Sequence, residues 1–164
     1  KLSLLSILIF ALGCRNNTQS GFENEEPISS APMATSKIIM TDTVFIVALG
    51  RNMSEMKFNK KVLRVPSEKN ITIALTNQST DITMPHNIVF IEKGHANDVG
   101  QGGLSHKNNA YVNPNDENVI AHSPLAQIGE TVYLSFETPK TGEYEFICSY
   151  PGHWGIMKGV FITE

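Results

Sequence analysis

The chain of 164 residues is poor in cysteine and tryptophan, with two and one residues respectively. Its formal net charge is only −3, and no basic stripe is present. Nucleic acid is therefore excluded as an expected partner, because binding it requires clustered Lys and Arg. With 41% hydrophobic residues, this length suffices for one domain with a sizeable core and hardly for two. No internal repeat is visible.

The longest apolar run is too short to cross a bilayer as a helix. It covers residues 2–12 behind Lys1, whereas a spanning helix needs roughly 20 apolar residues. Such a run indicates a secretory signal over residues 1–13. It ends in Ala-Leu-Gly-Cys, which resembles the lipobox of bacterial lipoproteins and implies that Cys14 becomes lipidated. Lipoboxes prefer Leu where this chain has Ala11, so a plain secretory signal with unmodified Cys14 is the alternative.

Residues 14–36 are polar and contain Gly, Pro, Ser and Asn, which predicts a lipidated flexible tether with an end-to-end distance of roughly 25 Å. We expect an exported protein anchored at a bacterial membrane, on its periplasmic or cell-surface side. A Cys14–Cys148 disulfide is conceivable in an exported chain. It would consume the best metal ligand, however, whereas lipidation of one cysteine and metal binding by the other account for both thiols.

From residue 37 onward, β-branched and aromatic residues recur with the period of strands. The predicted strands are 44–47, 61–65, 71–77, 87–91, 131–136, 144–148 and 159–162. Their number and punctuation favour an antiparallel β-sandwich over residues 37–164. The segment 94–129 is rich in Gly and Asn and lacks alternation. We expect it to form a flap over the sandwich, with room for one short helix.

One stretch near the C-terminus combines three metal-binding side chains. Cys148, His153 and Met157 are spaced C-x4-H and H-x3-M between two predicted strands. Cys and Met are soft ligands for Cu(I), and imidazole suits copper in both oxidation states. Each residue alone has an ordinary structural interpretation, but their joint spacing points to copper. A trigonal site needs one more imidazole, and His86 is the natural candidate.

The sequence CSYPGHWGIMKG at 148–159 resembles the copper loop of the azurin and auracyanin group of cupredoxins. The similarity extends over most of residues 40–164 and includes His86-Asn87, Val119-Ile120-Ala121-His122 and Met56-Lys57-Phe58-Asn59. The resemblance implies an all-β cupredoxin Greek-key sandwich of about seven to eight strands. It also implies one type 1 copper ion, whose ligands would be His86, Cys148, His153 and, as a weak axial ligand, Met157.

Residues around the ligands carry further implications of the resemblance. Asn87 matches an asparagine that braces the copper loop, and Ser149 stands where the family often has Thr. Azurins have Gly before the first His, and its carbonyl approaches copper. Here Pro85 occupies that position, which leaves open whether its carbonyl is a distant fifth ligand. Azurins proper also have an N-terminal disulfide, which the cysteine count excludes here.

In this family the second His reaches an apolar patch that meets redox partners. The residues that fall there are Met56, Met84, Tyr150, Pro151 and Trp154; packing of Trp154 under the flap is the alternative. The remaining histidines, His95, His106 and His122, fall within the flap. Since they form no His-x-His pair, we expect solvated side chains and not a second copper centre.

The sequence therefore predicts a monomeric electron carrier, not an enzyme, that passes single electrons between respiratory or photosynthetic-type redox partners. Copper delivery is a second hypothesis, which the absence of a Met-x-Met cluster weakens. A Cys–His hydrolase is a third, but nothing in the sequence supplies an oxyanion hole.

Overall fold

The computed structural model describes residues 42–81 and 83–164. The predicted signal over 1–13 and the tether over 14–36, with Cys14, lie outside the described residues. In the described part, nine strands form two sheets, accompanied by one α-helix and two short 3-10 helices. No helix of this part is long and apolar enough to span a membrane.

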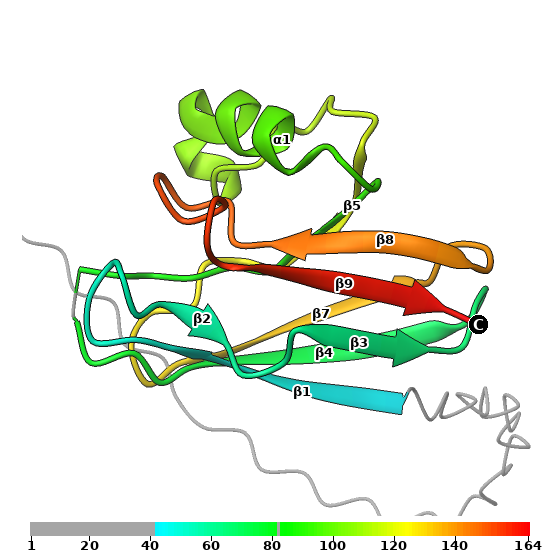
Figure 1. Ribbon diagram of the computed structural model, residues 1–164, viewed down its shortest axis with the longest axis horizontal. Helices are drawn as coiled ribbons and strands as arrows, with labels where there is room; N and C mark the ends of the chain where they lie inside the picture. The colour runs from blue at the N-terminus through cyan, green and yellow to red at the C-terminus, as the bar shows by residue number, and fades with distance from the viewer. Residues whose placement is uncertain (1–41, 82) are drawn as a thin grey trace, which may run out of the picture. The chain divides into compact units, whose positions relative to one another are not determined.

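The first sheet has four strands in the order β2-β1-β4-β7 (Figure 1). Their bounds are Lys57–Phe58 for β2, Asp42–Leu49 for β1, Asn70–Asn77 for β4 and Thr131–Glu137 for β7. The alternation predicted for β4 buries Ile71, Ile73 and Leu75 on the core face of the sheet, because successive strand residues point to opposite faces.

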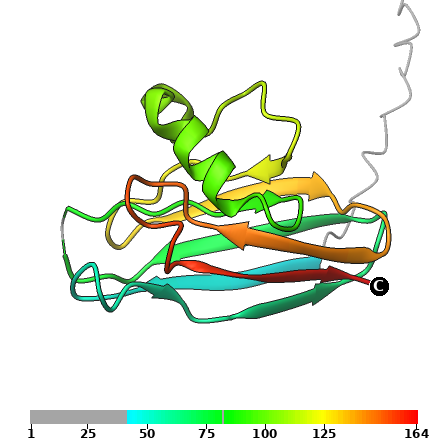
Figure 2. The ribbon, with the colours of Figure 1, turned by 45° about the horizontal axis from the view of Figure 1, so that its top comes forward.

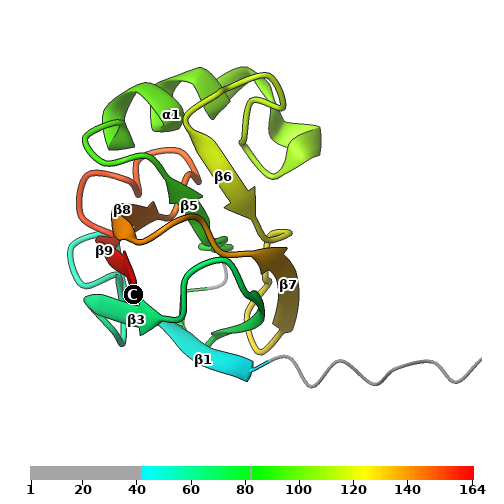
Figure 3. The same ribbon diagram turned by 90° about the vertical axis from the view of Figure 1, so that its right-hand side faces the viewer.

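The second sheet has five strands in the order β3-β9-β8-β5-β6. Their bounds are Val62–Val65 for β3, Lys158–Thr163 for β9, Gly142–Ile147 for β8, Val89–Ile91 for β5 and Val119–His122 for β6. Figure 3 shows this sheet end-on, lying between the first sheet and the helical segment. The β-sandwich predicted from the sequence is confirmed.

Two strand pairs differ from the antiparallel expectation. β1 runs parallel to β4, and β3 runs parallel to β9. Parallel neighbours cannot be joined by a tight hairpin and need a longer connection; here β2 and β3 intervene between β1 and β4. The strand count also exceeds the predicted seven to eight. The prediction missed β2, which has only two residues, and β6, which lies inside the expected flap.

The core lies between the sheets and contains an aromatic cluster around Phe90. Its ring centroid lies 4.6 Å from that of Phe161 and 5.0 Å from that of Phe136. Cys148 and Phe146 belong to the same cluster and are fully buried, as the shared strand face predicts. Burial of each large apolar side chain contributes about 1.5–3 kcal/mol, and Cys148 extends this cluster to the first residue after β8.

The predicted flap over 94–129 is only partly a flap. It begins with α1 (Ala96–Gly102) and continues through the 3-10 helices η1 (Gly103–Ser105) and η2 (Lys107–Asn109) (Figure 2). β6, however, is an edge strand that pairs antiparallel with β5. Its Val-Ile-Ala-His sequence is short and half-buried, which is why strand alternation did not reveal it.

Candidate metal centre

The copper loop, residues 148–157, starts directly after β8 and is closed by its own backbone. Cys148 N donates to Met157 O at 2.9 Å, and Met157 N donates to His153 O at 2.8 Å. Pro151 and Gly152 form the turn between them, and Gly152 has a φ of +84°, which a glycine adopts without strain. The loop therefore holds its three predicted ligands in a fixed relative position.

His86 approaches this loop from the connection between β4 and β5. Its backbone forms a two-way bridge with Ala126, from His86 N to Ala126 O at 3.1 Å and from Ala126 N to His86 O at 2.7 Å. The fully buried Asn77 side chain donates to Met84 O and to Ala126 O, both at 3.0 Å. Asn77 thus ties together the two segments that place His86. No sequence signal singled it out, because Asn at a strand end is also typical of turns.

The structure brings three of the four predicted ligands together. The ligand atoms of His86, Cys148 and His153 all lie within 4.8 Å of one another, and all three side chains are buried. The sulfur of Cys148 is 3.7 Å from Nδ1 of His86 and 3.5 Å from Nδ1 of His153. In residues 42–81 and 83–164, no other group of three or more His, Cys, Asp or Glu converges in this way.

These separations fit a metal ion bound by a thiolate and two imidazoles. Bond lengths of about 2.0 Å to nitrogen and 2.3 Å to sulfur, at tetrahedral to trigonal angles, place the two atoms about 3.5–3.7 Å apart. A His₂Cys set with a nearby thioether is the donor set of blue-copper centres. Hence the residues fit a copper ion without rearrangement of the protein.

Burial keeps all three groups neutral in the metal-free protein. Desolvation lowers the pKa of His86 to about 4, helped by the neighbouring His153, whose own pKa desolvation also lowers to about 4. Desolvation raises the pKa of the Cys148 thiol to about 12, although backbone hydrogen bonds from Asn87 and Tyr150 oppose the rise. Both imidazoles thus keep lone pairs for a metal, while the thiol must lose its proton on binding.

A buried amide braces the loop from outside. Asn87 Nδ2 donates to Ser149 Oγ at 2.8 Å, and Asn87 Oδ1 accepts from Ser149 N at 2.9 Å. This is the contact between Asn87 and Ser149 that the resemblance implies. Nδ2 also donates to Ala110 O at 2.8 Å, a partner in the flap that the sequence analysis missed.

Within the described part of the chain, His86 has no outer hydrogen-bond partner of the kind that a metal-binding imidazole usually has. Its Nε2 is buried and has no hydrogen-bond partner among the described residues, whereas metal-bound histidines normally donate this N–H to an acceptor. The orientation of the His86 ring therefore rests on packing and on its backbone bridge to Ala126.

Known proteins with the same pattern identify the family. A family model described as copper binding proteins, plastocyanin/azurin family, matches residues 45–164. The chain belongs to this family. The predicted copper cofactor is confirmed on that basis, and electron transfer is the general function of these blue copper proteins.

Individual members cover most of the domain. Azurin of Alcaligenes faecalis is 40% identical over 111 residues, which are 63% of this chain and 87% of azurin. Auracyanin-A of Chloroflexus aurantiacus is 34% identical over 121 residues, 72% of this chain and 74% of auracyanin-A. The solved structure of auracyanin A, a "blue" copper protein from a green thermophilic photosynthetic bacterium, matches with a TM-score of 0.64 and 31% identity, covering 74% and 99% of the two chains. Outer membrane protein H.8 of Neisseria meningitidis serogroup B is 34% identical over 109 residues, 63% of this chain and 60% of H.8.

Two of the residues expected in this cupredoxin's docking patch are not at the surface. Met56 and Met84 are each only 3% exposed, so neither contributes to a contact surface. Both are apolar residues in loops near the site, and such residues fill the core as readily as they line a patch.

Trp154 packs against the flap, as the alternative interpretation held. It belongs to a small apolar cluster with Val99 and Ile147. A methyl group added at Gly100 of α1 would lie 2.3 Å from the Trp154 ring. This close approach excludes any side chain at Gly100 and explains one of the glycines in the flap.

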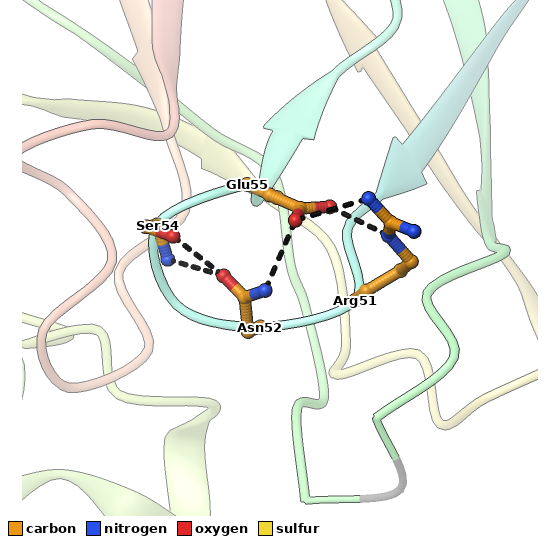
Figure 4. A network of polar contacts seen from close by, with 4 residues as sticks. All are labelled: Arg51, Asn52, Ser54 and Glu55. Atoms are coloured by element: carbon orange, nitrogen blue, oxygen red, sulfur yellow. Dashed lines mark hydrogen bonds and ion pairs between the residues drawn. The ribbon is translucent and has the colours of Figure 1, made fainter.

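Two other apolar side chains are exposed, one within the copper loop and one against it. Ile156 is 46% exposed and Met53 is 51% exposed, and the Met53 methyl group lies against Gly152. Figure 4 shows how polar contacts fix the turn that carries Met53. Arg51 pairs with Glu55 at 2.8 Å, and Asn52 Oδ1 accepts from Ser54 N and Oγ at 3.0 and 2.6 Å.

The spare histidines lie apart from the metal centre. His95 precedes α1 and its Nδ1 lies 3.5 Å from a carboxylate oxygen of Asp98. His106 stands between η1 and η2. His122 ends β6 and is not in the flap, contrary to the expectation. All three are half-buried.

Proposed function

We propose that this cupredoxin carries single electrons through one type 1 copper ion held by His86, Cys148 and His153, with Met157 as axial ligand. The convergence of the three ligand atoms in a buried, braced site carries the proposal. A bound copper ion supplies the redox couple. The protein supplies ligands that the closed loop and the Asn87 brace hold in place, so little reorganisation accompanies a change of charge.

Met157 is assigned by its place in the loop. It is fully buried as a member of the main core cluster, and its backbone bonds to both Cys148 and His153. A long thioether contact is the usual axial interaction in such sites. Pro85, directly before His86, offers a carbonyl as a distant fifth ligand, and this role is part of the proposal.

Addition of Cu(II) to the metal-free protein tests the assignment. We expect an intense visible thiolate-to-copper band, which Cys148→Ala abolishes and His106→Ala leaves intact. Met157→Leu keeps a band but raises the reduction potential, because loss of the axial lone pair destabilises the more positive Cu(II) more than Cu(I). A protein that binds Cu(II) without an intense band does not have a thiolate-bound copper, and the assignment is then wrong.

The same protein distinguishes electron transfer from copper delivery. A carrier of electrons retains its ion while exchanging electrons rapidly, whereas a delivery protein releases its ion to a chelator. Each ligand side chain is at most 1% exposed, which favours retention of the copper ion. Rapid loss of copper to a Cu(I) chelator, faster than electron self-exchange, would favour the delivery role instead.

Docking is assigned to the exposed Met53 and Ile156, together with the half-buried Tyr150 and Pro151 of the copper loop. Small apolar surfaces suit weak and transient complexes between redox proteins, here of the respiratory or photosynthetic type. We expect Ile156→Lys to slow electron self-exchange without altering the visible band. Val62→Lys is the matched control, since Val62 is 50% exposed on β3. Equal rates for both variants would remove Ile156 from the docking surface.

We further propose that Cys14 is lipidated and anchors the protein, as a monomer, to a bacterial membrane. The lipobox-like sequence supports this, and one relative carries the name outer membrane protein H.8. Expression of the chain with a complete signal sequence tests the anchor. Cys14→Ser should release the protein into the soluble fraction, whereas Cys148→Ser should leave it with the membranes. Membrane release by both variants, or by neither, contradicts the anchor.

A further inference from the structure

Three ring contacts run in series from the metal centre into the flap. The ring centroids of His86 and His153 are 5.0 Å apart, and those of His153 and Tyr150 are 4.9 Å apart. Tyr150 in turn meets Tyr111 edge-on, with centroids 5.2 Å apart and planes at 79°. Aromatic rings at these separations are in direct contact. The series begins at buried ligands and ends at the half-buried Tyr111.

The flap adopts a strained backbone where it delivers Tyr111. Ala110 and Tyr111 have φ values of 54° and 58°, in the left-handed region that costs a non-glycine residue about 1–3 kcal/mol. Such conformations persist only where the surroundings hold them, and they concentrate at functional sites. Two adjacent residues of this kind therefore need an explanation.

The residues that hold this turn are the ones that brace the copper loop. Ala110 O accepts from Asn87 Nδ2 at 2.8 Å and from Ser149 Oγ at 3.3 Å. Tyr111 N donates to His106 O at 3.0 Å. A methyl group at Gly103 would fall 2.0 Å from Tyr111 O, so this position accepts only glycine. The flap is thus fastened to the metal centre at the residue before Tyr111.

Core packing does not account for Tyr111. Tyr150 packs at the margin of the main core cluster, but Tyr111 belongs to neither apolar cluster of the described residues. Its described ring contact is the one with Tyr150. The fold therefore holds Tyr111 against the ring that touches a copper ligand.

From these contacts we infer that Tyr150 and Tyr111 form a second path for electrons, between His153 and the flap, in addition to the docking surface beside the loop. The inference rests on the proposed function. A one-electron donor at the flap is oxidised by one electron and the copper site is reduced by one. Both tyrosines remain neutral phenols and no proton moves. Tyr111 acts through Tyr150 and His153, so it is a positioning residue for electron transfer.

Ruthenium photochemistry on the copper-loaded full chain tests this path. A ruthenium polypyridyl group is attached to His106, next to Tyr111, after His95→Gln and His122→Gln have removed the competing imidazoles. The excited label donates one electron to the oxidised copper site. We expect Tyr111→Leu to slow this reduction and Tyr111→Phe, which keeps the ring, to restore it. A matched protein labelled at His95, with His106→Gln and His122→Gln, should show no effect of Tyr111→Leu.

Readouts that do not depend on the rate separate conduction from a structural role. The visible band and the reduction potential should be unchanged in Tyr111→Leu. In the metal-free protein, nuclear Overhauser contacts should connect the Tyr111 ring with Tyr150, and Tyr150 with His153. An unchanged rate from His106 in Tyr111→Leu, equal slowing from both labels, or absence of the ring contacts overturns the inference. If neither the His106 label nor the His95 label reduces the copper site, the proposed function itself is overturned.

Discussion

The brace between Asn87 and the copper loop predicts a large and measurable loss of stability on substitution. Asn87→Leu keeps the side-chain volume but leaves the fully buried Ser149 N–H without its acceptor, and it removes a donor from Ser149 Oγ and from Ala110 O. One stranded buried donor costs about 1–3 kcal/mol, and each lost hydrogen bond about 0.5–1.5 kcal/mol. The sum is about 2–6 kcal/mol, out of a total stability of about 5–15 kcal/mol.

Relaxation of the strained Ala110 backbone should offset part of this loss, so we expect a decrease in the free energy of unfolding in the lower half of that range. Urea unfolding of the metal-free protein, followed by fluorescence of its single tryptophan, gives the free energy directly. Asn118→Leu is the control, because the side chain of Asn118 bonds only within its own turn, to Asp116 at 3.0 Å.

The outcome that refutes the reasoning is a loss for Asn87→Leu below about 1 kcal/mol, or no larger than that of Asn118→Leu. Ser149→Ala provides an independent check. Since it removes the same Oγ contact, the double variant should lose less stability than the sum of the two single variants. If the losses of the two single variants add up to that of the double variant, the two side chains contribute to stability independently.

Further predictions concern the metal-free site, its binding of copper and the flap. The unfolded chain takes up protons on its histidines below about pH 6.5, whereas the folded His86 and His153 have a pKa of about 4. Stability should therefore fall as pH decreases from about 6.5 towards 4, a dependence that bound copper should suppress; a flat stability profile would contradict it. Above about pH 9 the unfolded thiol ionises first, because the folded Cys148 has a pKa of about 12, so stability should fall again on the alkaline side. Copper binding near neutral pH should release about one proton, from Cys148, which titration in weakly buffered solution measures, and Cys148→Ala should release none. Gly100→Ala should cost about 1–3 kcal/mol by overpacking against the tryptophan ring, whereas Gly102→Ala, which meets nothing closer than 3.9 Å, should cost little in the same urea assay.

The sequence predicts those parts of the metal centre whose residues lie close together in the chain. Cys148, His153 and Met157 lie within ten consecutive residues, so their spacing alone indicates copper chemistry. His86 is separated from Cys148 by 62 positions, so no local spacing joins it to the loop, and the family resemblance supported its choice over the other histidines. The period-two pattern of β4 likewise identified both the strand and its buried face.

Features that depend on the packing of distant segments were not predictable. The parallel pairing of β1 with β4 and of β3 with β9 leaves no mark on either strand alone. The expected exposure of Met56 and Met84 was wrong, because both are buried, and the exposed Met53 was not singled out. Nothing local to Ala110 indicates that its carbonyl would reach Asn87.

The position of β9 has a consequence for when the copper site comes into being. β9 is the last of the described strands in the sequence, yet it lies inside its sheet, between β3 and β8. Its pairing with β3 joins Val62 to Val160, and such distant contacts form late and slowly during folding. Cys148, His153 and Met157 are also synthesised close before β9. A nascent chain therefore carries His86 without its partner Cys148 while the 62 positions between them are synthesised, and the complete set of ligands exists only in a chain whose β8 and β9 can close the second sheet.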